Sequence, residues 1–165
     1  MPVFEEWKVI EGFPDYEVSN LGRVCSYKFK NKQKILSPTL HRNYLQVYLT
    51  TDERSYTKSI HRLVLIAFKT NPDPNYYNLC DHINRVSTDN RASNLRWSNT
   101  ILNNLNRSSV RGYSFCKSKR KYRVRLREFG KDKLIGYFST SYLARLAYLE
   151  AKRIYLKLID PHHHK

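Results

Sequence analysis

In KYRVRLRE (121–128), basic and apolar side chains alternate from Lys121 to Arg127. On a β-strand, successive side chains point to opposite faces. One face of this strand would be apolar, and the other would carry a row of guanidinium groups from Arg123, Arg125 and Arg127. A strand of this kind buries one face, so the pattern favours an antiparallel sheet that is covered on one side.

A cover for that sheet follows directly in the sequence. KLIGYFS predicts a further strand, and Ser139 to Ser141 offer N-caps for a long helix. The apolar face expected for this helix consists of Leu143, Ala147, Ala151, Ile154 and Leu158. We therefore expect residues 108–160 to form a three-stranded antiparallel sheet packed on one helix.

The first 52 residues predict a small, half-exposed antiparallel sheet. Short β-rich runs are separated by turns, and Asn20 to Gly22 supply residues that tolerate positive φ. The segment YLQVYLT (44–50) alternates, with apolar side chains on one face and Tyr and Gln on the other. This Tyr and Gln face is equally compatible with packing and with DNA contact.

The middle of the chain, residues 53–107, predicts the order helix, loop, strand, long loop, strand, helix. The apolar run at 59–70 favours a core helix, the loop NPDPNYYNL cannot continue it, and Ser98 is a plausible N-cap for a helix at 98–107. The predicted fold class is α+β. Its modules would be 1–52, 53–107 and 108–160, with a tail at 161–165.

The charge points to a polyanionic partner. The chain of 165 residues has 30 Lys and Arg against 14 Asp and Glu, a formal net charge of +16. Nucleic acid is the commonest such partner, and no basic amphipathic helix with an aromatic face favours a membrane surface instead. The three Cys residues form no CxxC pair, and the N-terminus does not resemble a signal peptide. We expect a soluble, intracellular protein.

The polar stretch CDHINRVSTDNRASNLRW (80–97) carries side chains suited to phosphodiester hydrolysis. A neutral His can take a proton from water near neutral pH, and a hard cation such as Mg²⁺ prefers carboxylate and amide oxygens. On a strand Asp81 and His82 would point to opposite faces unless a bulge or the strand end re-aims one of them. Asn103 or Asn104, on the following helix, could complete a metal site.

The same stretch, with SNTILNN after it, resembles the HNH nucleases, in particular their phage and intron-encoded homing branch. The resemblance implies a ββα-metal fold with His82 as general base and Asp81 and Asn103 as metal ligands. It implies that Asn94 holds the loop between the two strands, and it includes His61 as a phosphate-binding or supporting residue. Taken alone, His61 beside an apolar run is typical of a helix start or a core histidine.

The flanking segments have resemblances of their own. EEWKVIEGFPDYEVSNLGRVCSYK is similar to the nuclease-associated modular domain that precedes HNH units in phage enzymes. The C-terminal segment resembles the Apetala/ethylene-response DNA-binding domain, with Tyr122 where that family usually has Trp. The matching residues are Gly112, Phe115, Arg123, Arg125, Gly136, Phe138, Ala144, Ala147, Tyr148 and Ala151.

Basic residues of the C-terminal half are the candidates for DNA contact. Residues 107–127 contain nine Arg or Lys and no acid, whereas an ordinary exposed strand face mixes both signs. The residues predicted to contact DNA are Arg96, Arg107, Arg111, Lys117, Arg120, Lys121, Tyr122, Arg123, Arg125 and Arg127.

Together these observations predict a site-specific DNA endonuclease of the homing type. It would use one divalent ion, with Mg²⁺ expected, Mn²⁺ able to substitute and no structural zinc, and each monomer would nick one strand of double-stranded DNA. A dimer would serve double-strand cleavage, and the host compartment would be a bacterial cytoplasm. The alternatives are an inactive DNA-binding regulator and an HNH nuclease for structured DNA or RNA.

Overall fold

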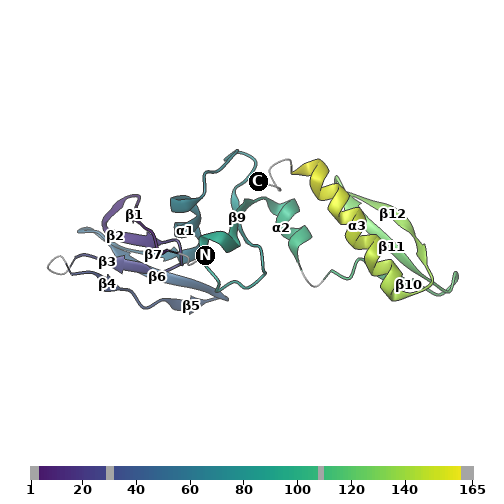
Figure 1. Ribbon diagram of the computed structural model, residues 1–165, viewed down its shortest axis with the longest axis horizontal. Helices are drawn as coiled ribbons and strands as arrows, with labels where there is room; N and C mark the ends of the chain where they lie inside the picture. Colours follow the sequence, from purple (N-terminus) through teal and green to yellow (C-terminus); the bar gives the residue numbers. More distant parts are fainter. Residues whose placement is uncertain (1–3, 29–31, 108–109, 161–165) are drawn as a thin grey trace. The chain divides into compact units, whose positions relative to one another are not determined.

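The computed structural model describes residues 4–28, 32–107 and 110–160, so the predicted tail at 161–165 lies outside the described residues. The chain divides into two compact units, Met1–Asn106 and Arg107–Lys165 (Figure 1). The predicted boundary between residues 52 and 53 lies inside the first unit, and the three-module division stays a prediction.

Two antiparallel sheets and a helix begin the first unit. The first sheet, in the order β1-β2-β3-β4, contains Trp7–Ile10, Phe13–Ser19, Val24–Ser26 and Lys34–Ile35. The second, β5-β6-β7, contains Thr39–His41, Tyr44–Thr50 and Ser55–Ser59. Helix α1 (Ile60–Phe68) follows β7 without a loop.

The second half of the unit confirms the predicted order of helix, loop, strand, long loop, strand and helix. After α1 come β8 (Leu79–His82), a 3-10 turn at Ala92–Asn94, β9 (Leu95–Ser98) and α2 (Thr100–Asn106). The predicted N-cap was wrong. Ser98 ends β9, and Asn99 caps α2 because its Oδ1 accepts a hydrogen bond from the Leu102 backbone N–H at 2.9 Å.

One hydrophobic core holds the first unit together. It joins Val18 and Val24 of the first sheet, Val47 of the second, Val64 of α1 and Leu95 of β9. The alternation in YLQVYLT reads as expected, because Val47 and Leu49 are buried while Tyr48 is exposed. Strand β9, which follows the polar loop, is therefore anchored in the same core as the N-terminal sheet.

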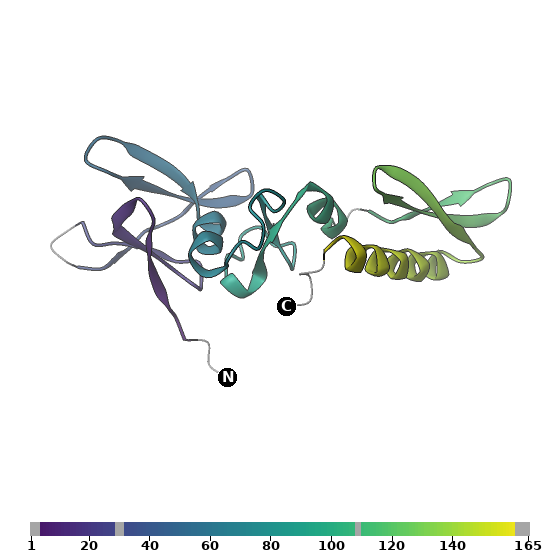
Figure 2. The ribbon, with the colours of Figure 1, turned by 90° about the horizontal axis from the view of Figure 1, so that it is seen from above.

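In the second unit, residues 110–160 form the predicted sheet and covering helix. Strands β10 (Tyr113–Cys116), β11 (Lys121–Glu128) and β12 (Lys131–Phe138) pair antiparallel in that order. Helix α3 (Ser141–Ile159) runs along one face of the sheet (Figure 2). It contacts β11, in which Val124 and Leu126 are buried. The predicted α+β fold class is confirmed.

The buried face of α3 differs from the predicted one. Ala144, Tyr148 and Tyr155 are buried, whereas Leu143, Ile154 and Leu158 of the predicted face are exposed. The helix has apolar side chains on all sides, so the hydrophobic pattern alone does not fix its rotation. Two aromatic contacts distinguish the buried face. The Tyr148 ring fills the space where Gly112 has no Cβ, and the Tyr155 hydroxyl accepts a hydrogen bond from the Phe129 N–H at 2.9 Å.

No helix within the described ranges is both long enough and apolar enough to cross a membrane.

The N-cap of α3 provides a test of this fold. Thr140 Oγ1 accepts a hydrogen bond from the Leu143 N–H at 3.2 Å. Thr140→Ala should lower the free energy of unfolding of the second unit by about 1 kcal/mol, because an orphan helix N–H loses its partner. Urea unfolding followed by circular dichroism measures this loss. Thr140→Ser keeps the hydroxyl and should retain most of the stability; an equal loss in both variants would contradict the capping role.

Candidate active site

Asp81 and His82 end strand β8, and both side chains are buried. β8 pairs antiparallel with β9, with Asp81 opposite Arg96 and His82 opposite Leu95. The chain turns immediately after the strand, where the Arg85 N–H donates to the His82 carbonyl at 2.9 Å and Arg85 has a φ of +66°. The acid and the imidazole therefore lie at a strand end, the position from which neighbouring side chains can be re-aimed.

The Asp81 carboxylate is held by two donors from neighbouring elements. Arg96 Nε and Nη2 lie 2.9 and 2.8 Å from Asp81 Oδ2. Asn106 Nδ2 lies 3.0 Å from each carboxylate oxygen and also donates to the His82 carbonyl at 3.0 Å. Since a buried carboxylate needs such partners, β9 and α2 are both bound to the end of β8 through Asp81.

Asn106 was not among the predicted site residues. It lies three residues after Asn103 on α2, and residues at that spacing share one face of a helix. The spacing to Asn103 could have indicated it. The structure thus brings Asn106 to Asp81, with Asn103 one helical turn earlier. Arg96, predicted to contact DNA, forms an ion pair with Asp81 within the chain.

His82 lies in a cluster of aromatic rings and amides. Its Nε2 is 3.1 Å from Asn90 Oδ1, and Asn90 is 4% exposed. The His61 ring meets the His82 ring edge-on at a centroid distance of 5.3 Å, and the Tyr44 ring is stacked at 6.1 Å. Neither Asn90 nor Tyr44 was predicted to belong to the site.

His61, on the first turn of α1, lies in a buried environment that favours the neutral form of its ring. Burial, together with the charges of His82 and Arg62, lowers the pKa of His61 to about 4. The Tyr44 ring lies 4.9 Å away on one side. Among the described residues no partner lies within hydrogen-bonding distance of its buried Nδ1. A neutral ring packed against His82 can fix that imidazole sterically.

Asn94 connects the two ends of the polar loop. Its Oδ1 accepts from the Asn84 backbone N–H at 3.0 Å, and its Nδ2 donates to Asn84 Oδ1 at 3.0 Å and to the Asp89 carbonyl at 2.8 Å. The Asp89 carboxylate in turn accepts from Arg91, whose guanidinium lowers the pKa of Asp89 to about 2. The segment between His82 and Leu95 is therefore an ordered loop.

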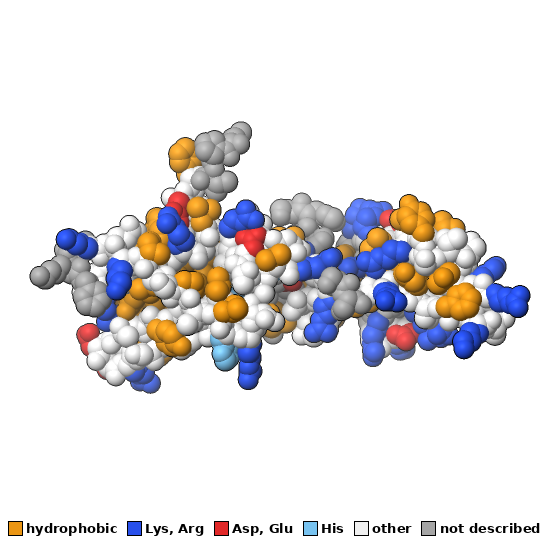
Figure 3. Space-filling view, turned by 90° about the horizontal axis from the view of Figure 1, so that it is seen from below, with side chains coloured by type: hydrophobic (Ala, Val, Ile, Leu, Met, Phe, Trp, Pro, Cys, Tyr) orange, Lys and Arg blue, Asp and Glu red, His pale blue; other side chains and the backbone are white. Residues whose placement is uncertain are grey.

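The face of the second unit's sheet away from α3 is basic. Arg125 and Arg127 are exposed on β11, while Val124 and Leu126 point to the helix side. Arg123 is partly buried. Arg107, Arg111, Lys117, Arg120 and Lys121 are also exposed, and Tyr122 is partly buried. Lys and Arg side chains are spread widely over the surface seen in Figure 3, with few acidic ones among them.

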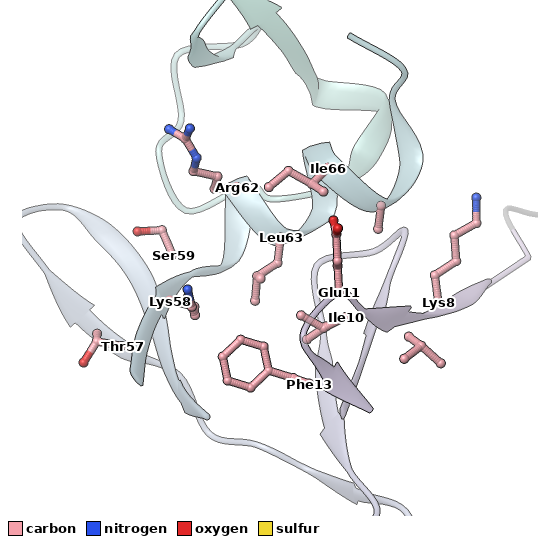
Figure 4. A pocket seen from close by; sticks show the side chains of 12 residues that line it. Lys8, Ile10, Glu11, Phe13, Thr57, Lys58, Ser59, Arg62, Leu63 and Ile66 are labelled. Atoms are coloured by element: carbon pink, nitrogen blue, oxygen red, sulfur yellow. The ribbon is translucent and has the colours of Figure 1, made fainter. Parts of the chain in front are cut away.

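A hollow of about 560 Å³ lies between β1, β2, β7 and α1 (Figure 4). Its apolar lining includes Ile10, Phe13 and Leu63, and Lys58 lies over the Phe13 ring at 5.4 Å. None of the predicted catalytic or metal-binding residues lines it.

Comparisons with known proteins identify chains of similar sequence and fold. Residues 5–50 match the NUMOD4 motif. Two curated relatives from Acanthamoeba polyphaga mimivirus are the uncharacterized HNH endonucleases L247, 46% identical over 96 residues, and L245, 32% identical over 94 residues. These alignments cover 56% and 57% of the chain but only 23% and 27% of the relatives, so the chain spans about a quarter of their length.

A solved structure, described as DNA binding and cleavage by the HNH homing endonuclease I-HmuI, shares the fold. It matches with a TM-score of 0.56 and 24% sequence identity, covering 96% of this chain and 94% of that one. The predicted resemblance is confirmed: the chain carries a NUMOD4 motif, is homologous to HNH endonucleases, and has the fold of an HNH homing endonuclease.

The bonds of Asn94 lead to a stability prediction. Asn94→Ala should reduce the free energy of unfolding by about 1–3 kcal/mol, because three hydrogen bonds across the loop are lost. Chemical denaturation measures this change, and hydrogen exchange of the amides at 83–91 should become faster. Asn104→Ala, at an exposed position on α2, is the matched control and should change neither. Equal stability of Asn94→Ala and wild type would refute the role of Asn94 in the loop.

Proposed function

We propose that this chain is a homing-type DNA endonuclease that hydrolyses one phosphodiester bond of double-stranded DNA. The observation that carries the proposal is the pairing of Asp81 and His82 at the end of β8, beside the amide-bearing helix α2. Its homology to HNH endonucleases supports the same activity.

In this proposal His82 acts as the general base. The imidazole accepts a proton from water, the water oxygen attacks phosphorus, and the bond from phosphorus to the leaving 3′ oxygen breaks. His61 and Tyr44 limit the movement of the His82 ring. Because His61 is uncharged at neutral pH, a supporting role suits it better than charge pairing with a phosphate.

The donor atoms at Asp81 fit a hard divalent cation. Asp81 offers two carboxylate oxygens whose positions are fixed by Arg96 and Asn106, and Asn103 carries an amide oxygen on α2. The Asn106 amide oxygen instead accepts from Arg85 Nε at 3.3 Å. Mg²⁺ is commonly bound by one or two carboxylates together with waters and substrate phosphates. When bound by Asp81 and Asn103, Mg²⁺ or Mn²⁺ would neutralise charge on the phosphate and the leaving oxygen.

DNA binding is assigned to the basic sheet of the second unit together with the N-terminal module. The exposed Arg125 and Arg127 lie on a sheet face that α3 leaves open. Contacts between guanidinium groups and phosphates provide affinity and orient the protein on the duplex. One catalytic His in each chain implies that a monomer nicks one strand.

The nuclease assignment predicts metal-dependent nicking of supercoiled plasmid that carries candidate target sites. His82→Ala should lower the nicking rate by roughly 10²–10⁴-fold, because the proton acceptor is lost. Gel electrophoresis with Mg²⁺, with Mn²⁺ and with a chelator measures the rate. His41→Ala, which removes an exposed histidine on β5, is the control and should nick at the wild-type rate.

Two results would contradict the nuclease assignment. Equal nicking by wild type and His82→Ala would remove His82 as the base. DNA binding without any nicking would favour an inactive DNA-binding regulator, and cleavage confined to structured DNA or RNA would favour the other alternative.

The DNA-binding assignment predicts weaker, less salt-dependent binding when an exposed guanidinium is lost. Arg125→Ala should lower DNA affinity and reduce the slope of log K against log salt concentration by about one. Fluorescence anisotropy over a salt series measures both. Arg153→Ala changes an exposed guanidinium on α3 that is paired with Glu150, and it is the matched control. An unchanged slope in Arg125→Ala would exclude Arg125 from the interface.

A further inference from the structure

The turn between β2 and β3 packs directly against the polar loop that follows His82. A Cβ placed on Gly22 would lie 2.9 Å from Asn90 Cβ and 3.1 Å from the Asn90 carbonyl carbon and oxygen. Gly22 also has a φ of +86°, a conformation that L side chains rarely adopt. The close approach of these two backbones therefore requires glycine at position 22.

Hydrogen bonds hold this turn rigidly and connect it to the loop. The Ala92 N–H donates to the Asn20 carbonyl at 2.8 Å, which joins the turn to the residues just after Asn90. The Asn20 side chain accepts from the Glu6 N–H at 3.0 Å and donates to the Phe4 carbonyl at 3.0 Å. The buried Ser19 hydroxyl accepts from the Arg23 N–H at 3.0 Å. The turn lies within residues 5–50, the range of the NUMOD4 motif.

Asn90 links this rigid turn to His82. Its side chain is buried, and its Oδ1 lies 3.1 Å from His82 Nε2, while its Nδ2 has no partner among the described residues. An amide oxygen accepts hydrogen bonds and cannot donate them. It therefore favours the His82 tautomer with the proton on Nε2, which leaves the lone pair on Nδ1.

We propose that Asn90 is a positioning residue for His82 and that the Gly22 turn of the NUMOD4 motif holds Asn90 in place. Asn90 selects the Nε2–H tautomer and the ring orientation, so that Nδ1 is the atom that receives the proton from water. The inference rests on the proposed nuclease function. It gives the N-terminal motif a part in the catalytic site, beyond any contact that the motif makes with DNA.

Two pairs of variants test this inference in the full-length chain. Asn90→Leu removes the acceptor at similar size, whereas Asn90→Asp keeps an acceptor oxygen. Gly22→Ala adds a methyl group against Asn90. Gly12→Ala adds the same group at a φ of +76° with nothing within 4 Å, so it carries a similar backbone penalty without the contact.

The first readout is the tautomer of His82, which does not depend on nuclease activity. Long-range ¹H–¹⁵N spectra of the protein labelled at histidine, at about pH 8 where imidazoles are mostly neutral, distinguish Nε2–H from Nδ1–H rings. A His82→Gln variant assigns the signal. Wild type, Asn90→Asp and Gly12→Ala should show the Nε2–H form, while Asn90→Leu and Gly22→Ala should show a mixture or the other tautomer.

The second readout separates catalysis from DNA binding. Single-turnover nicking by Asn90→Leu should fall roughly 10²-fold, the scale expected for a misplaced catalytic group. Its DNA dissociation constant should stay within about twofold of wild type, because no phosphate contact is removed. Gly22→Ala should lose nicking in the same direction, and Asn90→Asp and Gly12→Ala should keep most of it.

The outcomes distinguish the two proposals. A wild-type chain that never nicks DNA would overturn the nuclease proposal, while the tautomer measurement would still test the positioning. An Nδ1–H ring in wild type, or full nicking by Asn90→Leu, would overturn the role of Asn90. Equal nicking and equal spectra in Gly22→Ala and Gly12→Ala would overturn the role of the turn. If Asn90→Leu fails to fold, the wild-type spectrum and Asn90→Asp still decide.

Discussion

The buried carboxylate of Asp81 is the constraint on which the candidate active site depends. An unpaired charge at 5% exposure would cost far more than this small unit could tolerate, so the fold must bring donors to it. Arg96 arrives from the paired strand and Asn106 from the last turn of α2. The hydrogen bonds that stabilise the buried Asp81 carboxylate therefore also hold β8, β9 and α2 together in one site. Loss of Arg96 or of Asn106 would therefore disturb the packing of the other two of these three elements.

Much of the fold could be predicted because local patterns carry it. Alternation in residues 44–50 and 121–128 identified two strands and the faces they bury, and the apolar run at 59–70 identified α1. The rotation of α3 could not be predicted from its apolar residues, since these surround the helix. It depends on contacts distant in sequence, those of Tyr148 with Gly112 and of Tyr155 with Phe129. The cap of α2 was missed by one residue because Ser98 is still part of β9.

The residues of the candidate site likewise fall into those indicated by local sequence patterns and those that depend on contacts distant in sequence. Asp81, His82 and Asn94 stand in a contiguous motif, so their spacing alone could single them out. Asn106 could have been found from its helical spacing to Asn103, but its bond to Asp81 depends on where α2 packs. The contact between Gly22 and Asn90 joins residues 68 positions apart in the chain, and no periodicity encodes such a meeting. Local signals thus indicated the candidate reactive groups but not the side chains that contact them.

The shared core of the first unit limits the positions at which two related sequences can be recombined. Leu95, which begins β9 opposite His82, packs in one cluster with Val18 and Val47. A crossover between residues 52 and 53 would place the two sides of that cluster in different parent sequences, and only parents with matched side-chain volumes would pack. A crossover near 106 would leave the core of the first unit intact. Exchange of the second unit between related chains is therefore physically easier than exchange of residues 1–52.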